Sequence, residues 1–129
     1  MTRNVIMAER KETVFDAARR MASRKIGGLV IVELGRPVGV LTERDIVWKV
    51  TAHLKDPKKT TVEEVMTSPA VTVSPLTTLR AAARMMLQKK TRWLVVTRLD
   101  RCEGIITATD LTEGFLETFA RATKRRIPP

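Results

Sequence analysis

Cysteine, histidine and tyrosine are almost missing from this chain of 129 residues, which has one Cys, one His and no Tyr. The lone Cys102 cannot form a disulfide within the chain, which fits a reducing cytoplasm. Cys102 and His53 also fall short of the roughly four ligands of a structural zinc site. No apolar run approaches the ~20 residues that span a bilayer, and the first residues lack a secretory signal. We therefore expect a cytoplasmic protein without a metal or a membrane partner.

Amide side chains are also scarce, with a single Asn and a single Gln, whereas 24 Lys and Arg residues stand against 14 Asp and Glu. Few thermolabile amides and abundant charge are typical of thermophiles. The net charge of +10 favours polyanionic partners such as nucleic acid, an anionic surface or a phosphorylated small molecule. The excess charge is spread over both halves, and no helix-turn-helix, zinc-finger or aromatic RNA-binding motif occurs. Nucleic-acid binding is therefore an alternative and not the leading hypothesis.

One eight-residue pattern occurs twice, as GVLTERDI at 39–46 and as GIITATDL at 104–111. A shift of 65 positions aligns residues 1–51 with 66–116 without a gap and gives 15 identities in 51 pairs. The chain is therefore a duplicated unit, and we assign residues 1–60 and 61–129 to its two repeats. One such unit buries its core poorly, so the two should pack together.

Each repeat predicts the order strand, helix, strand, strand, helix, which is an α+β fold. The first helix has apolar residues at i, i+3, i+4 and i+7 from Val14, and the second repeat shows the same pattern from Leu79. Thr13 and either Thr77 or Thr78 are the expected caps of these helices. The predicted strands are residues 4–8, 29–33 and 38–41, then 70–73, 93–97 and 104–106; a linker spans 55–61, and the second helices begin after Thr42 and Thr107.

The Thr and the Asp of the repeated pattern allow two interpretations. In the structural one, Thr caps a helix and the acidic residue three positions later bonds back to the backbone. In the functional one, the Asp carboxylate accepts both hydroxyls of a ribose, while the Thr hydroxyl and the helix N–H groups meet a phosphate. Capping boxes prefer Glu or Gln at the third position, and Asp45 and Asp110 depart from that preference. No nucleophile–base pair emerges, so we do not expect an enzyme.

Over essentially its whole length the chain resembles a stand-alone pair of CBS domains, the module named after cystathionine β-synthase and also called a Bateman module. The likeness rests on the two octapeptides, the doubled element order and the MTSPAVTVSP opening of the second repeat. It implies a pseudo-two-fold pair, two clefts that each accept an adenosine nucleotide (AMP, ADP or ATP), a regulatory role and a homodimer. Val30 and Val95 stand where many family members have Pro.

The resemblance also implies that each cleft combines the Thr and Asp of one repeat with the opening and central strands of the other. One cleft would contain Thr42 and Asp45 with Ala70, Val71 and residues 90–93. The other would contain Thr107 and Asp110 with Val5, Ile6 and residues 25–28. The first repeat begins at Met1 and has no counterpart of residues 62–65 before its Met-Thr, which makes the second of these clefts the less firmly defined.

Basic residues lie between the first helix and the next strand of each repeat, where they could meet a phosphate or simply cap a helix. The phosphate candidates are Arg24, Lys25, Arg44, Lys90 and Arg92, with Lys89 adjacent. The base-pocket candidates are Val5, Ile6, Gly27, Gly28, Ala70, Val71 and Trp93. We expect Trp93 to pack in the strand face more than to stack on a base, and the two clefts to differ in affinity. As a third alternative, the chain is a ligand-free scaffold that dimerises through Phe115, Leu116 and Phe119.

Overall fold

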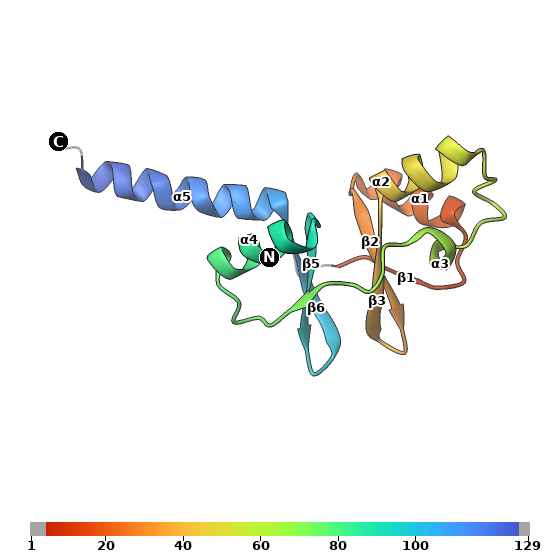
Figure 1. The fold of residues 1–129 in the computed structure, drawn as a ribbon, viewed down its shortest axis with the longest axis horizontal. Helices are drawn as coiled ribbons and strands as arrows, with labels where there is room; N and C mark the ends of the chain where they lie inside the picture. The colour runs from red at the N-terminus through yellow and green to blue at the C-terminus, as the bar shows by residue number, and fades with distance from the viewer. Residues whose placement is uncertain (1–4, 127–129) are drawn as a thin grey trace.

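The computed structural model describes residues 5–126, with side chains as far as Ala122, as two similar halves that lie side by side (Figure 1). The first half comprises β1 (Met7–Glu9), α1 (Val14–Arg24), β2 (Gly28–Glu33), β3 (Arg36–Thr42), α2 (Glu43–Asp45), a π-helical turn η1 (Ile46–Val50) and a 3₁₀ turn η2 (Thr51–His53). After the linker come α3 (Val62–Val65), β4 (Thr72–Val73), α4 (Leu79–Lys89), β5 (Trp93–Arg98), β6 (Arg101–Thr107) and α5 (Ala108–Arg126).

The two sheets have the same topology and the same register. Each has three strands in sequence order, the first parallel and the third antiparallel to the central strand. Gly28 pairs with Thr42 in one sheet, and Trp93 pairs with Thr107 in the other. Even the bulge after Ile31 recurs at the equivalent position of β5. The predicted duplicated α+β fold is thus confirmed at the level of single residue pairs.

Three apolar clusters form the core, one in each half and one between the two sheets. One lies beneath α1 in the first half and includes Val62 and Val65 of α3, and a second fills the other half. The third lies between the two sheets and is centred on Val30, Val40 and Val95. Burial of large apolar side chains on both faces of β2 and β5 explains their nearly continuous apolar sequences. The sheets therefore pack against each other about the expected pseudo-two-fold.

The opening strands are shorter than predicted. Residues 4–8 and 70–73 were expected as strands, whereas β1 begins at Met7 and β4 at Thr72, and Asn4 lies outside the described residues. Val5 and Ala70 instead pack against the cluster between the sheets. The strands therefore begin later than predicted, although Ile6 and Val71 already accept backbone hydrogen bonds from the central strands.

The first helix of each repeat has the expected cap. The Thr13 hydroxyl accepts from the backbone N–H of Asp16, and Thr78, not Thr77, does the same at the start of α4. Both helices end in a left-handed residue, Lys25 in one and Lys90 in the other. This matched ending turns the chain directly into the central strand of each sheet.

Helix α5 extends well beyond the second sheet (Figure 1). Leu111 is buried in the core of the second half, and Gly114 lies close to Leu79 of α4. Every residue from Phe115 to Ala122 is exposed. In the described part of the chain, no helix combines the length and the apolar character that crossing a bilayer requires.

Candidate functional site

Thr42 and Asp45 form a reciprocal cap where β3 ends and α2 begins. The backbone N–H and the hydroxyl of Thr42 donate to Asp45 Oδ2 at 3.0 and 3.1 Å. The backbone N–H of Asp45 donates to Thr42 Oγ1 at 3.3 Å. The structural interpretation of the repeated motif therefore holds in this repeat, with Asp in the place usually taken by Glu.

The other carboxylate oxygen of Asp45 has partners from outside the motif. The Thr67 hydroxyl donates to Oδ1 at 2.9 Å, and the Lys49 ammonium lies 2.9 Å from the same atom. Asp45 is 4% exposed, so this buried carboxylate is balanced by one cation and by hydroxyl and amide donors. Lys49 was not among the residues predicted for the site, although its spacing of four residues from Asp45 in the predicted helix is typical of an ion pair. A signal also existed for Thr67, because the Met-Thr pair at 66–67 repeats that at 1–2.

The Gly of the repeated motif lets the segment after α3 approach the edge of the first sheet. This segment runs antiparallel beside β3, and Val40 and Thr67 exchange backbone hydrogen bonds of 2.9 and 3.0 Å. A Cβ at Gly39 would lie 2.7 Å from Met66 Sδ and 2.9 Å from the Thr67 carbonyl oxygen. Gly39 is therefore required by the close approach of the linker, which in turn brings the Thr67 hydroxyl to Asp45.

A cavity of about 710 Å³ opens beside this cap, between the two repeats. Nine of the residues predicted from the sequence line it, namely Gly27, Thr42, Arg44, Asp45, Ala70, Val71, Lys90, Arg92 and Trp93. The rest of the wall is formed by Val40, Glu43, Thr67, Ser68, Pro69, Lys89 and Thr91. The structure thus brings the Thr and Asp of the first repeat together with the opening and central strands of the second.

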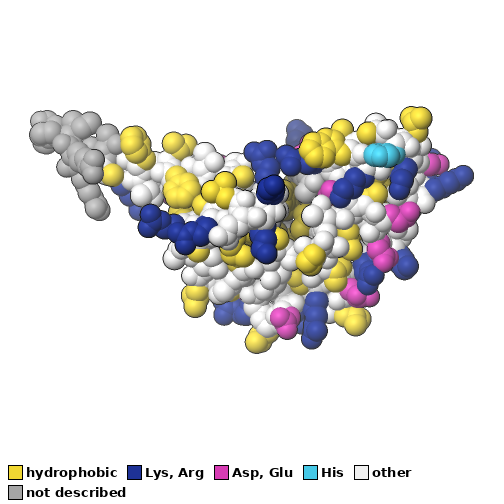
Figure 2. Space-filling model, viewed as in Figure 1, with side chains coloured by type: hydrophobic (Ala, Val, Ile, Leu, Met, Phe, Trp, Pro, Cys, Tyr) yellow, Lys and Arg dark blue, Asp and Glu magenta, His cyan; other side chains and the backbone are white. Residues whose placement is uncertain are grey.

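The cavity is rich in positive charge. Arg44, Lys89, Lys90 and Arg92 line it, and none of the four forms an ion pair within residues 5–126. The guanidinium of Arg44 lies 4.9 Å from the ring centre of Trp48. Figure 2 shows Lys and Arg side chains around the hollow where the two halves meet. This arrangement suits an anion, because unpaired cations at the rim of a cleft concentrate negative charge there.

Backbone geometry explains the two valines that replace proline. The N–H of Val95 donates to the Val71 carbonyl at 2.9 Å, and the N–H of Val30 donates to the Ile6 carbonyl at 3.2 Å. A proline could make neither bond, since it has no backbone N–H. In this chain the opening segment of each repeat is therefore tied directly to the central strand.

Trp93 packs against Gly28, which is the residue at its equivalent position in the first repeat. A Cβ at Gly28 would lie 2.8 and 2.9 Å from two atoms of the Trp93 ring. Trp93 also packs against the apolar cluster between the sheets, as expected, while lining the cavity. Gly28 thus provides space for an indole from the other repeat, and it is not among the residues that line the two cavities.

The Thr107 motif has the same cap with fewer partners. The Thr107 N–H donates to Asp110 Oδ2 at 2.9 Å, and the Asp110 N–H donates to Thr107 Oγ1 at 3.2 Å. Asp110 is half-buried, and Thr2, the counterpart of Thr67, lies outside the described residues. At the position of Lys49 the second repeat has Gly114. The two carboxylates therefore have different surroundings.

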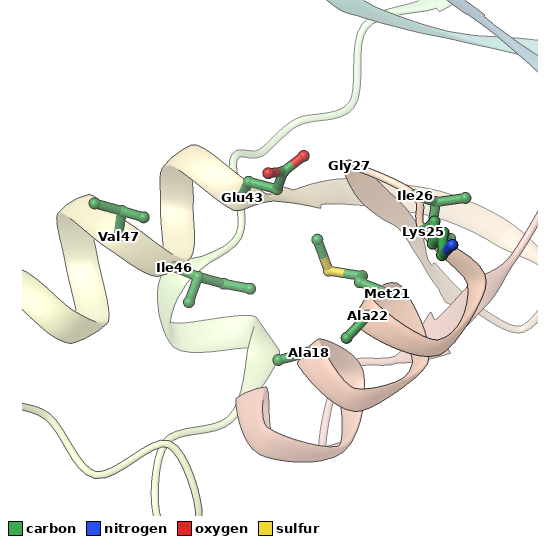
Figure 3. Close-up of a pocket in the computed structure, with 9 residues that line it drawn as sticks. All are labelled: Ala18, Met21, Ala22, Lys25, Ile26, Gly27, Glu43, Ile46 and Val47. Carbon is green, nitrogen blue, oxygen red and sulfur yellow. The ribbon is translucent and has the colours of Figure 1, made fainter.

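The residues assigned to this second cleft do not all gather beside Thr107. Lys25 instead lines a separate cavity of about 490 Å³ inside the first repeat, between α1 and η1 (Figure 3). Gly27 lines both cavities, and Arg24 is exposed. The cations that follow α1 and α4 are thus inequivalent, because the turn after α1 faces its own repeat as well as the interface.

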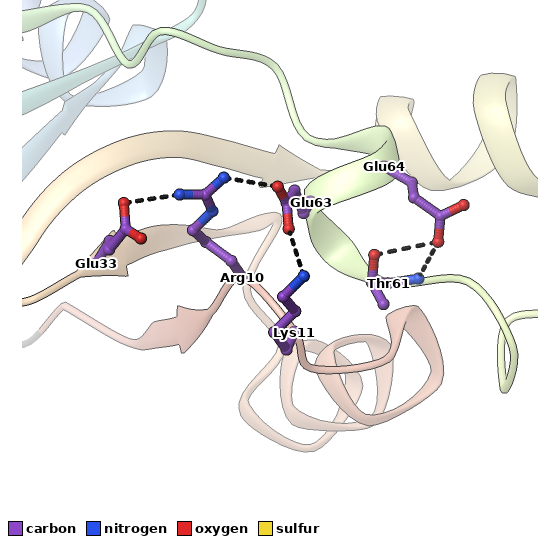
Figure 4. Close-up of polar contacts among 6 residues, drawn as sticks. All are labelled: Arg10, Lys11, Glu33, Thr61, Glu63 and Glu64. Atoms are coloured by element: carbon purple, nitrogen blue, oxygen red, sulfur yellow. Dashed lines mark hydrogen bonds and ion pairs between the residues drawn. The ribbon is translucent and has the colours of Figure 1, made fainter.

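An ion-pair network holds α3 and the linker on the first repeat (Figure 4). Arg10 binds Glu33 at 2.7 Å and Glu63 at 2.6 Å. The Arg10 guanidinium lowers the pKa of Glu63, chiefly through this hydrogen bond. The N–H and hydroxyl of Thr61 lower the pKa of Glu64 in the same way. These contacts fix the segment that carries Thr67 to the cap.

Comparisons with known proteins agree with this architecture. The CBS domain profile matches residues 1–51 and 62–117. The CBS domain-containing protein YhcV of Bacillus subtilis is 33% identical over 111 residues, covering 86% of this chain and 79% of YhcV. An uncharacterized protein of Methanopyrus kandleri is 34% identical over 113 residues, and the match spans 86% of this chain but 58% of that protein.

A solved structure with the same fold is the hexameric CBS-CP12 protein of bloom-forming cyanobacteria. It is 35% identical with a TM-score of 0.83, over 91% of this chain and 70% of that one. CBS pairs are commonly regulatory modules. Two profile matches, one to each repeat, and two sheets of one topology lead to the same conclusion: the chain belongs to the CBS domain family.

Proposed function

We propose that this protein is a regulatory module that binds an adenosine nucleotide, AMP, ADP or ATP, in the cavity beside Asp45. The observation that supports this most strongly is the meeting of apolar, hydroxyl, carboxylate and cationic groups from both repeats around one cavity. Its volume of about 710 Å³ lies within the range of roughly 300–1,000 Å³ typical of small-molecule pockets.

The cavity offers a different surface to each part of a nucleotide. Ala70, Val71 and Trp93 supply an apolar wall suited to a base. Arg92 and the neighbouring lysines supply charge for the phosphates, and arginine can bind a phosphate through two parallel hydrogen bonds. Asp45 would serve the ribose. The presence of all three kinds of group around one cavity supports a ligand that has an aromatic base, a sugar and at least one phosphate.

Titration calorimetry tests this proposal with AMP, ADP, ATP, uncharged adenosine and S-adenosylmethionine. We expect the phosphorylated ligands to bind more tightly than adenosine. Arg92→Met should weaken AMP binding about tenfold, the size expected for loss of one charge-assisted contact. Arg121→Met on α5 removes an equal charge far from the cavity and serves as the control. Absence of nucleotide binding, or equal effects of the two substitutions, would contradict the assignment.

We also propose that the module forms a homodimer through its helices. Large apolar side chains are exposed on η1, α4 and α5, among them Trp48 at 60%, Leu87 at 81% and Phe119 at 70%. Such a concentration of exposed apolar groups is typical of an interaction surface. Phe119→Glu should shift the molar mass measured by light scattering from dimer to monomer. Leu34→Asn at a hairpin tip, on the side away from the helices, should leave the mass unchanged.

A further inference from the structure

The carboxylate of Asp45 has no free place for a ribose in the described structure. A carboxylate offers about four acceptor positions. Thr42 fills two through its N–H and hydroxyl, Thr67 fills a third, and the Lys49 ammonium fills the fourth. A ribose that donates to Asp45 must therefore replace a partner that is already there.

Lys49 is the partner that can leave at the lowest cost. The Thr42 donors belong to the cap, so their loss would open the start of α2. The Thr67 hydroxyl is held in place by the two backbone bonds between Thr67 and Val40. The Lys49 side chain is 44% exposed and is held through its terminal ammonium, which water can solvate once it is released.

The same ammonium also binds the end of α3. Lys49 Nζ donates to the carbonyl oxygen of Val65 at 3.0 Å. Val65 is the last residue of α3, where carbonyl groups have no partner within the helix. Departure of Lys49 from Asp45 would therefore also remove a partner from the segment that leads into the second repeat.

We propose that Lys49 competes with a ribose for Asp45 from the side of α3, outside the residues that line the cavity, and that a bound nucleotide displaces it from Asp45 and releases the end of α3. This inference rests on the proposed nucleotide site. It makes Lys49 a positioning residue that competes with the ligand and couples occupation of the cavity to the linker. Such coupling requires a contact that differs between the empty and the bound state, and the contact of Lys49 with Val65 differs in this way.

A lysine that competes for the motif aspartate is present in the first repeat alone. Gly114 occupies the position equivalent to Lys49 and offers no ammonium to Asp110. Lys49 projects from the π-helical turn η1, whereas the equivalent residues of the second repeat lie in the regular helix α5. π-Helical turns are frequent at functional positions. One cleft of the pair therefore has a built-in competitor.

The test compares nucleotide affinity in three variants by calorimetry. Lys49→Met keeps the length of the side chain and removes the competing ammonium, Lys49→Arg keeps a competing cation, and Lys59→Met removes an equal charge from an exposed part of the linker. Loss of a positive charge should by itself weaken anion binding. Displacement predicts the opposite sign: Lys49→Met should bind AMP about two- to fivefold more tightly than the wild type, while Lys49→Arg should not.

Hydrogen exchange of residues 62–66 provides the second readout. Saturating AMP should speed exchange in the wild-type chain, whereas Lys49→Met should exchange at the faster rate without any ligand. If the wild type binds AMP but Lys49→Met binds equally or more weakly, the displacement mechanism is wrong and the nucleotide site stands. If the wild type binds no nucleotide, both proposals are wrong.

Discussion

At the scale of the residue, Asp45 combines two roles that a sequence motif presents as alternatives. It closes the cap at Thr42, and it lies in the wall of the cavity between the repeats. A capping residue is held in one orientation by the helix it begins, which is also what a ligand-binding carboxylate requires. Structural and binding effects of its replacement must therefore be measured separately.

Replacement of the two motif aspartates should cost unequal stability. Asp45→Ala leaves Lys49 and Thr67 without their acceptor, so we expect the free energy of unfolding to fall by about 2 to 3 kcal/mol. Asp110→Ala removes a cap with fewer partners and should cost about 1 kcal/mol. Urea unfolding followed by circular dichroism measures both values. Equal losses would show that the contacts of Asp45 outside the cap contribute nothing.

Alanine substitutions at Gly39 and Gly27 test whether the close contact of Met66 and Thr67 with β3 contributes to stability. Gly39→Ala places a methyl group against the Thr67 backbone and should lower the free energy of unfolding by about 1 to 3 kcal/mol. At Gly27 the nearest atom to a new Cβ is the flexible end of Glu43, which can move aside. Thermal unfolding of both alanine variants should therefore show a clear loss for Gly39 alone. A stable Gly39→Ala protein would mean that the linker can shift.

At the scale of the element, α3 is a short helix whose position depends on ion pairs. Arg10 joins β1 to the hairpin through Glu33 and to α3 through Glu63. Val62 and Val65 anchor the opposite face of α3 in the first core. A helix of this length is not stable by itself, so these contacts determine where the linker enters the second repeat.

This element should make stability depend on pH in the acid range. The pKa values of Glu63 and Glu64 are both lowered from 4.5 in the folded chain, by Arg10 and by Thr61 respectively. Their stabilisation is therefore complete above pH 4.5 and is lost as the pH falls through the folded pKa values. Melting temperatures between pH 7 and 3 should fall less steeply for Glu63→Gln and Glu64→Gln than for the wild type. Glu117→Gln, on exposed α5, should follow the wild-type curve.

Most of the elements could be predicted from the sequence, because each shows a local periodicity that occurs in both repeats. Thr13 as a cap and the start of a helix after Thr42 have local signals, although that helix is the short α2 followed by η1 and η2. Helix α3 was not predicted. The path of the linker has no such signal. Thr67 reaches Asp45 because the chain returns alongside β3, and such a long-range contact leaves no period in the sequence. Gly27 likewise lines two cavities because of the way the repeats pack. Lys49, by contrast, lies four residues after Asp45 in the same helical segment.

At the scale of the whole molecule, the two sheets create the candidate site by packing unevenly. Val30 and Val95 are fully buried between them, and close packing there leaves the space beside Asp45 open at the edge. The two repeats differ at positions near this site: Gly28 opposes Trp93, and Gly114 stands at the position equivalent to Lys49. The two repeats share one fold, but the cleft beside Asp45 has its own charge and shape. The two clefts of the pair are therefore expected to differ in their affinity for a ligand.

The net charge of +10 predicts how the whole molecule meets nucleic acid. Diffuse cations should bind duplex DNA and single-stranded RNA weakly and without sequence preference, with the logarithm of affinity falling linearly with the logarithm of salt concentration. Fluorescence anisotropy with several unrelated oligonucleotides measures this affinity at about 50 and 200 mM salt. Non-specific binding weakens strongly between these two concentrations. AMP binding should change less between the two, because charges in a partly buried cleft are screened less than charges on an open surface. A sequence preference that survives at the higher salt concentration would favour nucleic acid as the partner, and the cations around the cavity would then have to be reassigned to a phosphate backbone.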